Sequence, residues 1–210
     1  MAMTDTIFNH RSIRKYKPDA IPGEVMDRVL EAGSRASTTG NMQVYSMVVT
    51  KDEKIRKQLW EAHFKQEMVL LAPVHITFCA DFNRFNKWCR SRGADPGYDN
   101  FLSFFTAAID ALLASQNVAL EAEANGLGIC YLGTATYMAD RIIDILSLPT
   151  GVVPVAALVL GYPDEEPGLT DRLPMEAVVH PETYRDYRED DIDRIYAERE
   201  GSRLTLDLLE

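Results

Sequence analysis

The sequence predicts an α+β fold built as one layered domain. Two observations favour this class. Helical and strand-like segments are mixed without strict alternation, and one apolar helix of unusual length lies in the middle of the chain. Hydrophobic residues make up 46% and charged residues 26% of the 210 residues, which suits a packed core. A chain of this length is most simply one domain, residues 1–210, with residues from about 165 to 210 as an extended arm.

Amphipathic and β-branched patterns predict the elements of the first half. Residues 22–36 place Val25, Val29, Leu30 and Ala32 near one face, as in a helix. Segments rich in β-branched and aromatic residues predict strands over 44–50 and 74–80, with a charged helix from 52 to about 62 between them.

Residues 101–125 predict one long helix that is apolar on nearly every side. No proline or glycine interrupts the run before Gly126, and 25 helical residues would span about 38 Å. A helix that is apolar all round must be buried, either in a large core or between subunits. Its polar residues, such as Asp110 and Glu121, make a bilayer span the weaker alternative. We therefore expect burial against a second copy of the chain.

The remaining elements follow glycine and proline signals. Gly126 and Gly128 end the long helix. A short strand is expected over 129–132, a helix over 138–148, a strand buried on both faces over 152–160, and an exposed arm or peripheral helix over 182–200.

Charge and cysteine usage exclude several classes of function. Thirty-two acidic and 22 basic residues give a net charge of -10, which disfavours nonspecific binding to nucleic acid or anionic lipid. Three widely spaced cysteines, Cys79, Cys89 and Cys130, form no C-x-x-C pair, so neither a disulfide framework nor a zinc knuckle is expected. The N-terminal residues lack a secretory apolar stretch, and we expect a cytoplasmic protein.

Three short polar segments are candidates for ligand binding. Residues 10–15, H-R-S-I-R-K, gather cations and a hydroxyl in an acidic chain, which suits a phosphate or a delocalised oxyanion; a solvated basic turn is the alternative. Residues 37–43, S-T-T-G-N-M-Q, could bond a heteroaromatic edge or a ribityl chain, or could simply connect a helix to a strand. Residues 128–134 run from a strand into a glycine turn that could present backbone N–H groups, or could be core alone.

Other common chemistries lack their motifs. The chain contains no P-loop, no G-x-S-x-G and no G-x-G-x-x-G sequence. Its four histidines, His10, His63, His75 and His180, form no pair at helical spacing, so no metal is expected. Nothing in the spacing of Asp81 and Asp99 distinguishes them from surface carboxylates.

An ordered set of motifs resembles the FMN-dependent nitroreductase family, and within it the major oxygen-insensitive NADPH nitroreductases and flavin reductases. The resemblance covers residues from about 7 to about 200. It consists of H-R-S-I-R at 10–14, S-T-T-G-N-M-Q at 37–43, A-D-F-N-R at 80–84, G-L-G-I-C-Y-L-G at 126–133 and L-G-Y-P…R-L-P at 160–174. It implies a central, mainly antiparallel sheet flanked by helices, with the long apolar helix at a homodimer interface.

The resemblance also implies a set of FMN-binding residues. His10, Arg11 and Ser12 would hold the phosphate and ribityl end together with Arg172. Arg14 would face the pyrimidine edge, where its charge stabilises the anionic reduced ring, and Gln66 would contact the ring. Thr38, Thr39, Asn41 and Gln43 would reach FMN from the opposite subunit, while Tyr131, Leu132, Gly133 and Thr134 would flank the N5 side, mainly through backbone N–H groups.

The activity implied by the resemblance is hydride transfer from NADH or NADPH through flavin N5 to nitroaromatics, quinones or flavins, in a ping-pong order. No catalytic side chain is expected, because the cofactor carries the chemistry. Arg199 and Arg203 match basic residues that read the extra phosphate of NADPH, whereas Thr170 and Ser37 replace a family lysine and proline, so the choice of nicotinamide stays open. A noncatalytic flavin-binding or sensory protein and a structural helical dimer are the alternatives.

Overall fold

The computed structural model describes residues 3–97 and 100–200. The chain divides into two compact units, Met1–Leu169 and Thr170–Glu210. The first unit contains the sheet and all the motif segments named above except the R-L-P sequence, which belongs to the second unit.

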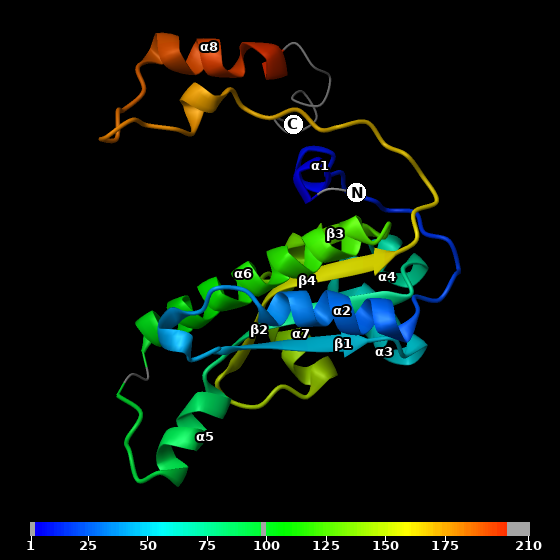
Figure 1. The fold of residues 1–210 in the computed structure, drawn as a ribbon, viewed down its shortest axis with the longest axis vertical. Helices are drawn as coiled ribbons and strands as arrows, with labels where there is room; N and C mark the ends of the chain where they lie inside the picture. The colour runs from blue at the N-terminus through cyan, green and yellow to red at the C-terminus, as the bar shows by residue number, and fades with distance from the viewer. Residues whose placement is uncertain (1–2, 98–99, 201–210) are drawn as a thin grey trace. The chain divides into compact units, whose positions relative to one another are not determined.

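The first unit is built on a four-stranded sheet. Its strands are β1 (Tyr45–Thr50), β2 (Val74–Asp81), β3 (Gly128–Leu132) and β4 (Val152–Gly161), in the order β1-β2-β4-β3. All neighbouring strands are antiparallel, as expected, and the β2 to β4 register shifts between Phe78 and Cys79 (Figure 1). Every residue of central strand β2 is buried, because helices cover both faces of the sheet.

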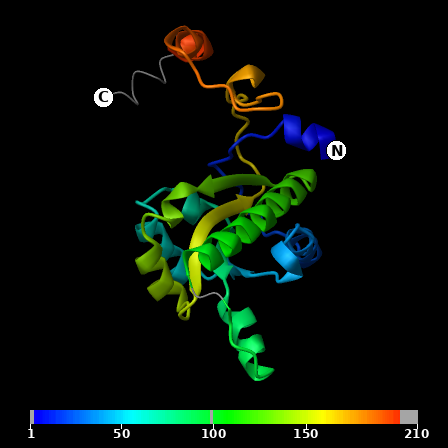
Figure 2. The ribbon, with the colours of Figure 1, turned by 90° about the vertical axis from the view of Figure 1, so that its left-hand side faces the viewer.

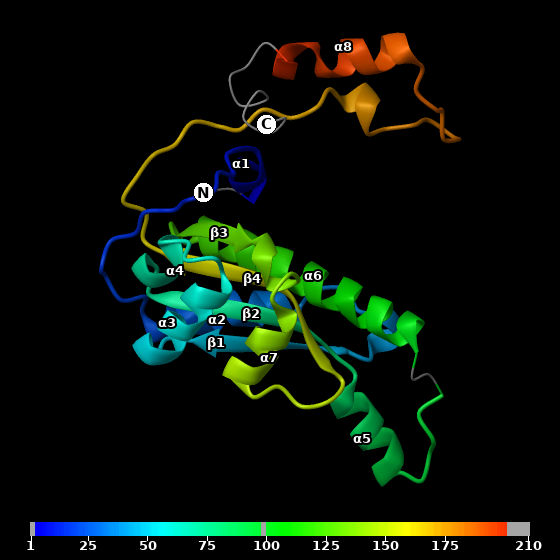
Figure 3. The same cartoon turned by 180° about the vertical axis from the view of Figure 1, so that it is seen from behind.

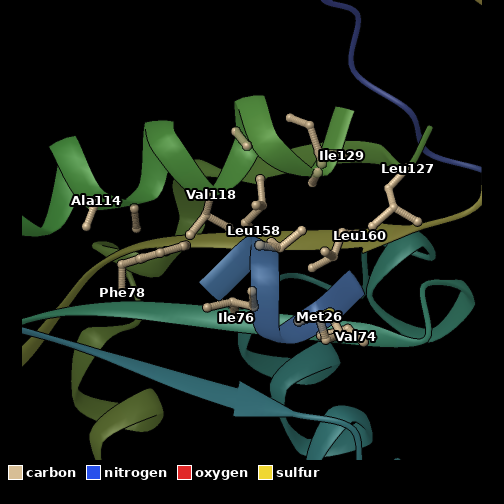
Figure 4. Close-up of a cluster of buried hydrophobic side chains, with 14 of the residues drawn as sticks. Met26, Val74, Ile76, Phe78, Ala114, Val118, Leu127, Ile129, Leu158 and Leu160 are labelled. Carbon is tan, nitrogen blue, oxygen red and sulfur yellow. The ribbon is translucent and has the colours of Figure 1, made fainter. Parts of the chain in front are cut away.

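Helices α2 (Gly23–Ser34) and α6 (Phe101–Ala124) cover one face of the sheet. Figure 4 shows their contact with the strands, where Met26 and Val118 pack against side chains such as Ile76, Phe78 and Leu158. The small residues Ala111, Ala114 and Ala122 of α6 are fully buried and allow the helix to approach the sheet closely. The predicted inward face of α2 differs in one detail, since Met26 is buried and Val25 only half-buried.

A second helical layer covers the opposite face. It consists of α3 (Glu53–Ala62), the single turn α4 (Met68–Leu71) and α7 (Ala139–Leu146), seen from behind in Figure 3. Leu59, Val69 and Ile142 pack there against Ala157 and Val159 of β4. The α+β prediction is therefore confirmed, with helical layers on both faces of an antiparallel sheet.

Besides the single turn α4, two described helices of the first unit have no counterpart among the predicted elements. Helix α1 (Met3–Phe8) contacts α6. Helix α5 (Asn83–Ser91) buries none of its residues and lies away from the sheet in Figures 1 and 2. The second unit contains a short 3₁₀ turn, η3 (Met175–Ala177), and α8 (Glu189–Glu200), within the range for which an arm or peripheral helix was expected.

Helix α6 has two apolar sides with different surroundings. One side is buried against the sheet and α2, and it includes the carboxylate of Asp110, which is 1% exposed. The other side leaves six large apolar side chains exposed: Phe101, Leu102, Phe105, Ile109, Leu112 and Leu113. By length and hydropathy alone the helix could cross a membrane, but a buried core helix passes the same test.

Candidate functional site

The cationic segment at residues 10–14 lies against the edge strand β3. Ser12 forms a parallel bridge with Ile129, and the backbone N–H of Ile13 donates to the Ile129 carbonyl at 2.8 Å. Gly128 permits this approach, because a Cβ there would lie only 2.7 Å from the Ile13 side chain. Two polar segments more than 100 residues apart, 10–14 and 128–134, thereby meet at one edge of the sheet.

His10 attaches this segment to the end of α6. Its Nδ1 lies 2.7 Å from a carboxylate oxygen of Glu123. Burial raises the pKa of Glu123, while the hydrogen bond and charge of His10 act in the opposite direction. The contact places His10 at the C-terminal end of α6, where a cation is also favoured by the helix dipole.

The two arginines of the segment have different surroundings. Arg11 donates from Nη1 to the Pro167 carbonyl at 2.9 Å and lies 3.8 Å from Glu166, so it holds the chain that follows β4. Arg14 is exposed, and its guanidinium makes no hydrogen bond or ion pair with any residue that the structure describes. Its backbone N–H donates to Glu165 at 2.5 Å. Arg14 is thus the guanidinium left available for a ligand.

A cavity of about 360 Å³ adjoins the docked segment. Its lining includes Arg11, Ile13, Glu123 and Glu165. The carboxylates of Glu123 and Glu165 repel an anion, and Arg11 is the cation named beside them. A phosphate bound in this cavity would therefore need further cations. The resemblance assigns Arg172 to the FMN phosphate as well. Arg172 lies in the second unit, where its Nη1 donates to the carbonyls of Thr170 and Asp171.

The end of β3 supplies a second group of predicted residues. The Tyr131 hydroxyl donates to Ser115 at 3.0 Å, and Leu132 is buried in the core, so Leu132 can offer only its backbone to a ligand. Gly133 and Thr134 begin the 3₁₀ turn η2 (Gly133–Ala135). Gln66 donates from Nε2 to the Thr134 hydroxyl at 3.4 Å, which brings these two predicted residues together.

A buried histidine pair, not predicted as part of a site, lies behind Thr134. His63 Nδ1 is 2.6 Å from the Thr134 hydroxyl, and the Nε2 atoms of His63 and His75 are 3.1 Å apart. Both rings are fully buried. Burial lowers the pKa of His63 to about 4 and that of His75 to about 3, so both are neutral at pH 7.

The polar loop at residues 37–43 is fixed by Asp110 of α6. The Thr38 hydroxyl and the Thr39 backbone N–H donate to its two carboxylate oxygens at 2.5 and 3.0 Å. The Thr38 hydroxyl also accepts from the Gln43 backbone N–H at 2.8 Å, and Gln43 Nε2 donates to the Asn41 side chain at 3.2 Å. The Thr38 hydroxyl therefore already donates and accepts a hydrogen bond within the chain. Thr39, Asn41 and Gln43 are exposed.

The A-D-F-N-R motif at 80–84 braces the other end of this loop. Arg84 donates to the backbone carbonyls of Gln43 and Tyr45, the latter at 3.1 Å, and lies 3.8 Å from the buried carboxylate of Asp81. Gln43 has a φ of 52°, in the left-handed region that disfavours side chains. The arginine therefore holds a conformation that the loop would not favour by itself.

The polar loop and the His10 segment are held at different positions along α6. Asp110 holds the loop and Glu123 holds His10, and 13 helical residues of 1.5 Å each separate the two carboxylate positions by about 20 Å along the axis. Among the described residues, no hydrogen bond or ion pair joins the loop to the His10 segment. A second cavity, of about 320 Å³ and mainly apolar, lies beside the loop and includes Met42, Phe85 and Leu102 in its lining.

The remaining predicted residues belong to the second unit. Arg199 donates from Nε to Asp171 at 2.9 Å, and Arg203 lies outside the described residues. The assignment of both residues to NADPH stays a prediction. Asp110, Glu123, His63 and His75 are the site neighbours that sequence reasoning missed, because their partners are distant in the chain.

The fold defines an α+β protein with candidate ligand-binding side chains gathered at a sheet edge and along one helix. Comparison with known proteins identifies the family. Residues 7–162 match the nitroreductase family, and the chain belongs to it. The FMN reductase (NADPH) of Bacillus subtilis strain 168 is 34% identical over 182 residues, which cover 86% of this chain and 73% of that protein.

Solved structures show the same fold. The NADPH:FMN oxidoreductase from Vibrio harveyi, solved with NAD⁺, superimposes with a TM-score of 0.88 at 29% identity, covering 99% of this chain and 91% of that chain. A protein from Bacteroides fragilis NCTC 9343 has a TM-score of 0.92 at 50% identity, covering 95% of this chain and 81% of the other. The resemblance inferred from the motifs is confirmed.

Proposed function

We propose that this chain is an NAD(P)H-dependent flavin oxidoreductase with FMN as its bound cofactor. The names of the relatives support the reaction class, since they include an FMN reductase (NADPH) and NADPH-flavin oxidoreductases. One structural observation indicates which residues would contact the flavin. The guanidinium of Arg14 has no hydrogen-bond or ion-pair partner among the described residues, and its segment is docked on β3 at Ile129. Gln66 and Thr134 add neutral polar groups just after β3 ends.

The donor set of this chain fits FMN. A phosphate requires cations or hydroxyls, which Arg11, Ser12 and Arg172 would provide, and an isoalloxazine edge requires a mixture of charged and neutral donors, which Arg14, Gln66 and the backbone at 132–134 would provide. When bound, FMN supplies the hydride chemistry that connects the nicotinamide to the final acceptor. The side chains of the site bind and orient, and none is required as a nucleophile.

Arg14 has the clearest electrostatic role. Its charge is permanent, it has no competing carboxylate partner among the described residues, and it lies close enough to lower the pKa of the buried Cys130 thiol against the larger effect of burial. A cation in this position stabilises negative charge on a bound ring system. We propose that NADH or NADPH and a nitroaromatic, quinone or flavin acceptor use the same space in turn, in ping-pong order.

We also propose that the active form is a homodimer. The polar loop lies about 20 Å along α6 from the His10 segment, so the two predicted halves of the site would meet only between copies. The exposed apolar side of α6 is a surface that a second copy would cover. The second unit is proposed to be an arm of the same domain, because α8 buries only Ile195. The free cysteines suit the reducing cytoplasm.

The decisive experiment measures turnover by the purified full-length protein. FMN is added, unbound flavin is removed, and oxidation of NADH and NADPH is followed separately with a quinone, a nitroaromatic and free FMN as acceptors. We expect a bound flavin band and parallel double-reciprocal plots. Arg14→Gln should weaken FMN binding, whereas Arg35→Gln, an exposed change at the end of α2, should not. FMN binding without turnover across all six combinations would instead support a noncatalytic flavin protein.

A further inference from the structure

The chain after β4 returns to the sheet edge and pairs with the residues that end the cationic segment. The Asp164 backbone N–H donates to the Lys15 carbonyl at 2.9 Å, and the Lys17 backbone N–H donates to the Tyr162 carbonyl at 2.9 Å. The other end of the segment is attached to β3, as described above. Arg14 lies between these two attachments, where the backbone passes from one partner to the other.

Glu165 joins the two attachments. One oxygen of its carboxylate, Oε1, accepts the backbone N–H of Arg14 at 2.5 Å and that of Lys15 at 3.0 Å. Both donors are backbone amides, which can only donate through nitrogen, so the direction of both hydrogen bonds is fixed. Glu165 is half-buried, and it lines the same cavity of about 360 Å³ as Arg11. The carboxylate therefore holds the backbone of the candidate site at the edge of a described cavity.

Two neighbouring N–H groups that reach one oxygen require a corner in the chain. In an extended strand the groups of successive residues point to opposite sides, so two adjacent N–H groups do not share one acceptor. The backbone therefore turns between Arg14 and Lys15. Convergent N–H groups of this kind form a concavity that binds an anion. Here the anion is the Glu165 side chain, and without it both N–H groups would be free to turn towards water.

A carboxylate is an unexpected neighbour for a site that is proposed to bind a phosphate and a ring that becomes anionic. Glu166, the next residue, shows what a glutamate needed only for charge balance would look like. Its side chain is 92% exposed and lies 3.8 Å from Arg11, and it accepts no hydrogen bond from the residues described. Glu165 instead uses one oxygen for two backbone donors, and charge-assisted hydrogen bonds of this kind are the stronger ones. This difference indicates that Glu165 has a task at the corner.

We propose that Glu165 is a positioning residue that fixes the corner at Arg14 and Lys15 and thereby directs the Arg14 guanidinium towards bound FMN, an inference that rests on the proposed function. The allowed rotamers of a side chain depend on its own φ and ψ, so a fixed corner restricts where the guanidinium can lie. Nothing else among the described residues holds that guanidinium. A cation kept in one place stabilises the anionic reduced flavin more than a mobile cation does.

The first test needs no flavin. Hydrogen exchange of the Arg14 and Lys15 backbone amides is measured by NMR in the full-length protein. Glu165→Gln should retain the wild-type protection, because its amide oxygen still accepts both bonds. Glu165→Ala should raise both exchange rates about tenfold, as expected for the loss of an ordinary hydrogen bond. Glu166→Ala removes an equal charge from the same cavity and should leave both rates unchanged. Equal rates in Glu165→Ala and Glu165→Gln would overturn the inference.

The second test compares Glu165→Ala with Glu165→Gln in the presence of FMN. Both variants lose the same charge and differ in the acceptor for the two N–H groups, so the effect of charge cancels in the comparison. Affinities for oxidised and reduced FMN are titrated separately, which yields their ratio even where binding is weak. We expect this ratio to favour reduced FMN about tenfold less in Glu165→Ala, which corresponds to a midpoint potential lower by about 30 mV.

A double variant shows whether the effect passes through Arg14. In an Arg14→Gln background, Glu165→Ala and Glu165→Gln should give the same ratio, because the cation that the corner directs is gone. A general structural defect would weaken binding of both oxidation states alike and would leave the ratio unmoved. A difference in the ratio that persists without Arg14 would refute the positioning role.

The positioning role and the proposed function can fail separately. If the wild-type protein binds FMN and turns over, but Glu165→Ala and Glu165→Gln give one ratio, the positioning role is refuted and the reductase proposal stands. If the wild-type protein binds no FMN, the proposed function fails and the direction of Arg14 towards FMN fails with it. The exchange rates would in that case still report whether Glu165 holds the corner.

Discussion

The carboxylate of Asp110 accepts a hydrogen bond from the Thr38 hydroxyl at 2.5 Å, across 72 positions of sequence. Asp110 is 1% exposed, and its second oxygen accepts from the Thr39 backbone N–H. A buried carboxylate requires such donors to offset its lost hydration. The polar loop is therefore shaped before any ligand or second copy arrives.

Replacement of Asp110 by Ala should lower the free energy of unfolding by about 1–3 kcal/mol, because two donors of the loop lose their acceptor. Asp110→Asn should cost less, since an amide oxygen still accepts one hydrogen bond. Urea denaturation measures both changes, and Asp27→Asn on the exposed side of α2 is the control. Equal stability of Asp110→Ala and the control would show that the loop does not depend on this carboxylate.

The buried histidines predict a loss of stability in mild acid. Their pKa values are about 4 and about 3 in the folded protein and near 6.5 when unfolded, so below pH 6.5 the unfolded chain binds protons that the native state excludes. The free energy of unfolding should therefore fall as the pH is lowered from 6.5 towards 4, by up to about 1.4 kcal/mol per pH unit for each histidine. Above pH 7 this contribution is fully present.

Denaturation in urea at pH 7, 6 and 5 measures that slope. The charge of Arg56 acts on His75, and Thr134 contacts His63, so each histidine titrates beside other polar groups. Comparing variants isolates the contribution of one histidine to the slope. His75→Phe should reduce the slope, because one titrating group is removed, while Thr77→Val should retain it. An unchanged slope in His75→Phe would mean that other groups whose folded pKa is lowered, such as His63, dominate acid unfolding.

The hydrophobic pattern was sufficient to predict most helices and strands of the fold, while their arrangement around the sheet came from the family resemblance. The four strands and the helices α2, α3, α6 and α7 lie within a few residues of the predicted ranges, since each presents an apolar face to the core. Helix α5 was not predicted because none of its residues is buried and it has no inward stripe to detect. Helix α4 is a single turn, too short for a helical period to emerge.

The candidate site was predictable only in part. The motif resemblance indicated Arg14, Gln66 and Thr134, and the structure brings Gln66 and Thr134 into contact. The resemblance gave no indication of Asp110 or of His63, whose partners lie 72 and 71 positions away. A buried carboxylate on a helix has the same sequence signature as an exposed one. Such contacts arise from tertiary packing and not from local pattern.

Gly128 should be the least tolerant glycine of the site. A Cβ at this position would lie 2.7 to 2.9 Å from three atoms of the Ile13 side chain, so Gly128→Ala should force Ile13 and the docked segment away from β3. We expect a destabilisation of about 1–3 kcal/mol and weaker FMN binding. Gly23→Ala is the control, because nothing lies within 4 Å of the added Cβ. Thermal unfolding and flavin titration of both variants distinguish this packing effect from a general intolerance of alanine.

A charge on the exposed apolar side of α6 should separate the proposed dimer and release FMN together. Leu113 is 44% exposed in one chain, and Leu113→Glu would place a carboxylate where a second copy is expected to pack. Sedimentation equilibrium should give the wild type twice the 23.6 kDa of one chain and shift the variant towards the monomer. Leu70→Glu, at a similarly exposed leucine of α4, is the control. Because the polar loop lies about 20 Å along α6 from the His10 segment, the monomer should also lose flavin affinity. A wild-type monomer that binds FMN fully would show that one chain completes its own site, and the shared arrangement would have to be abandoned.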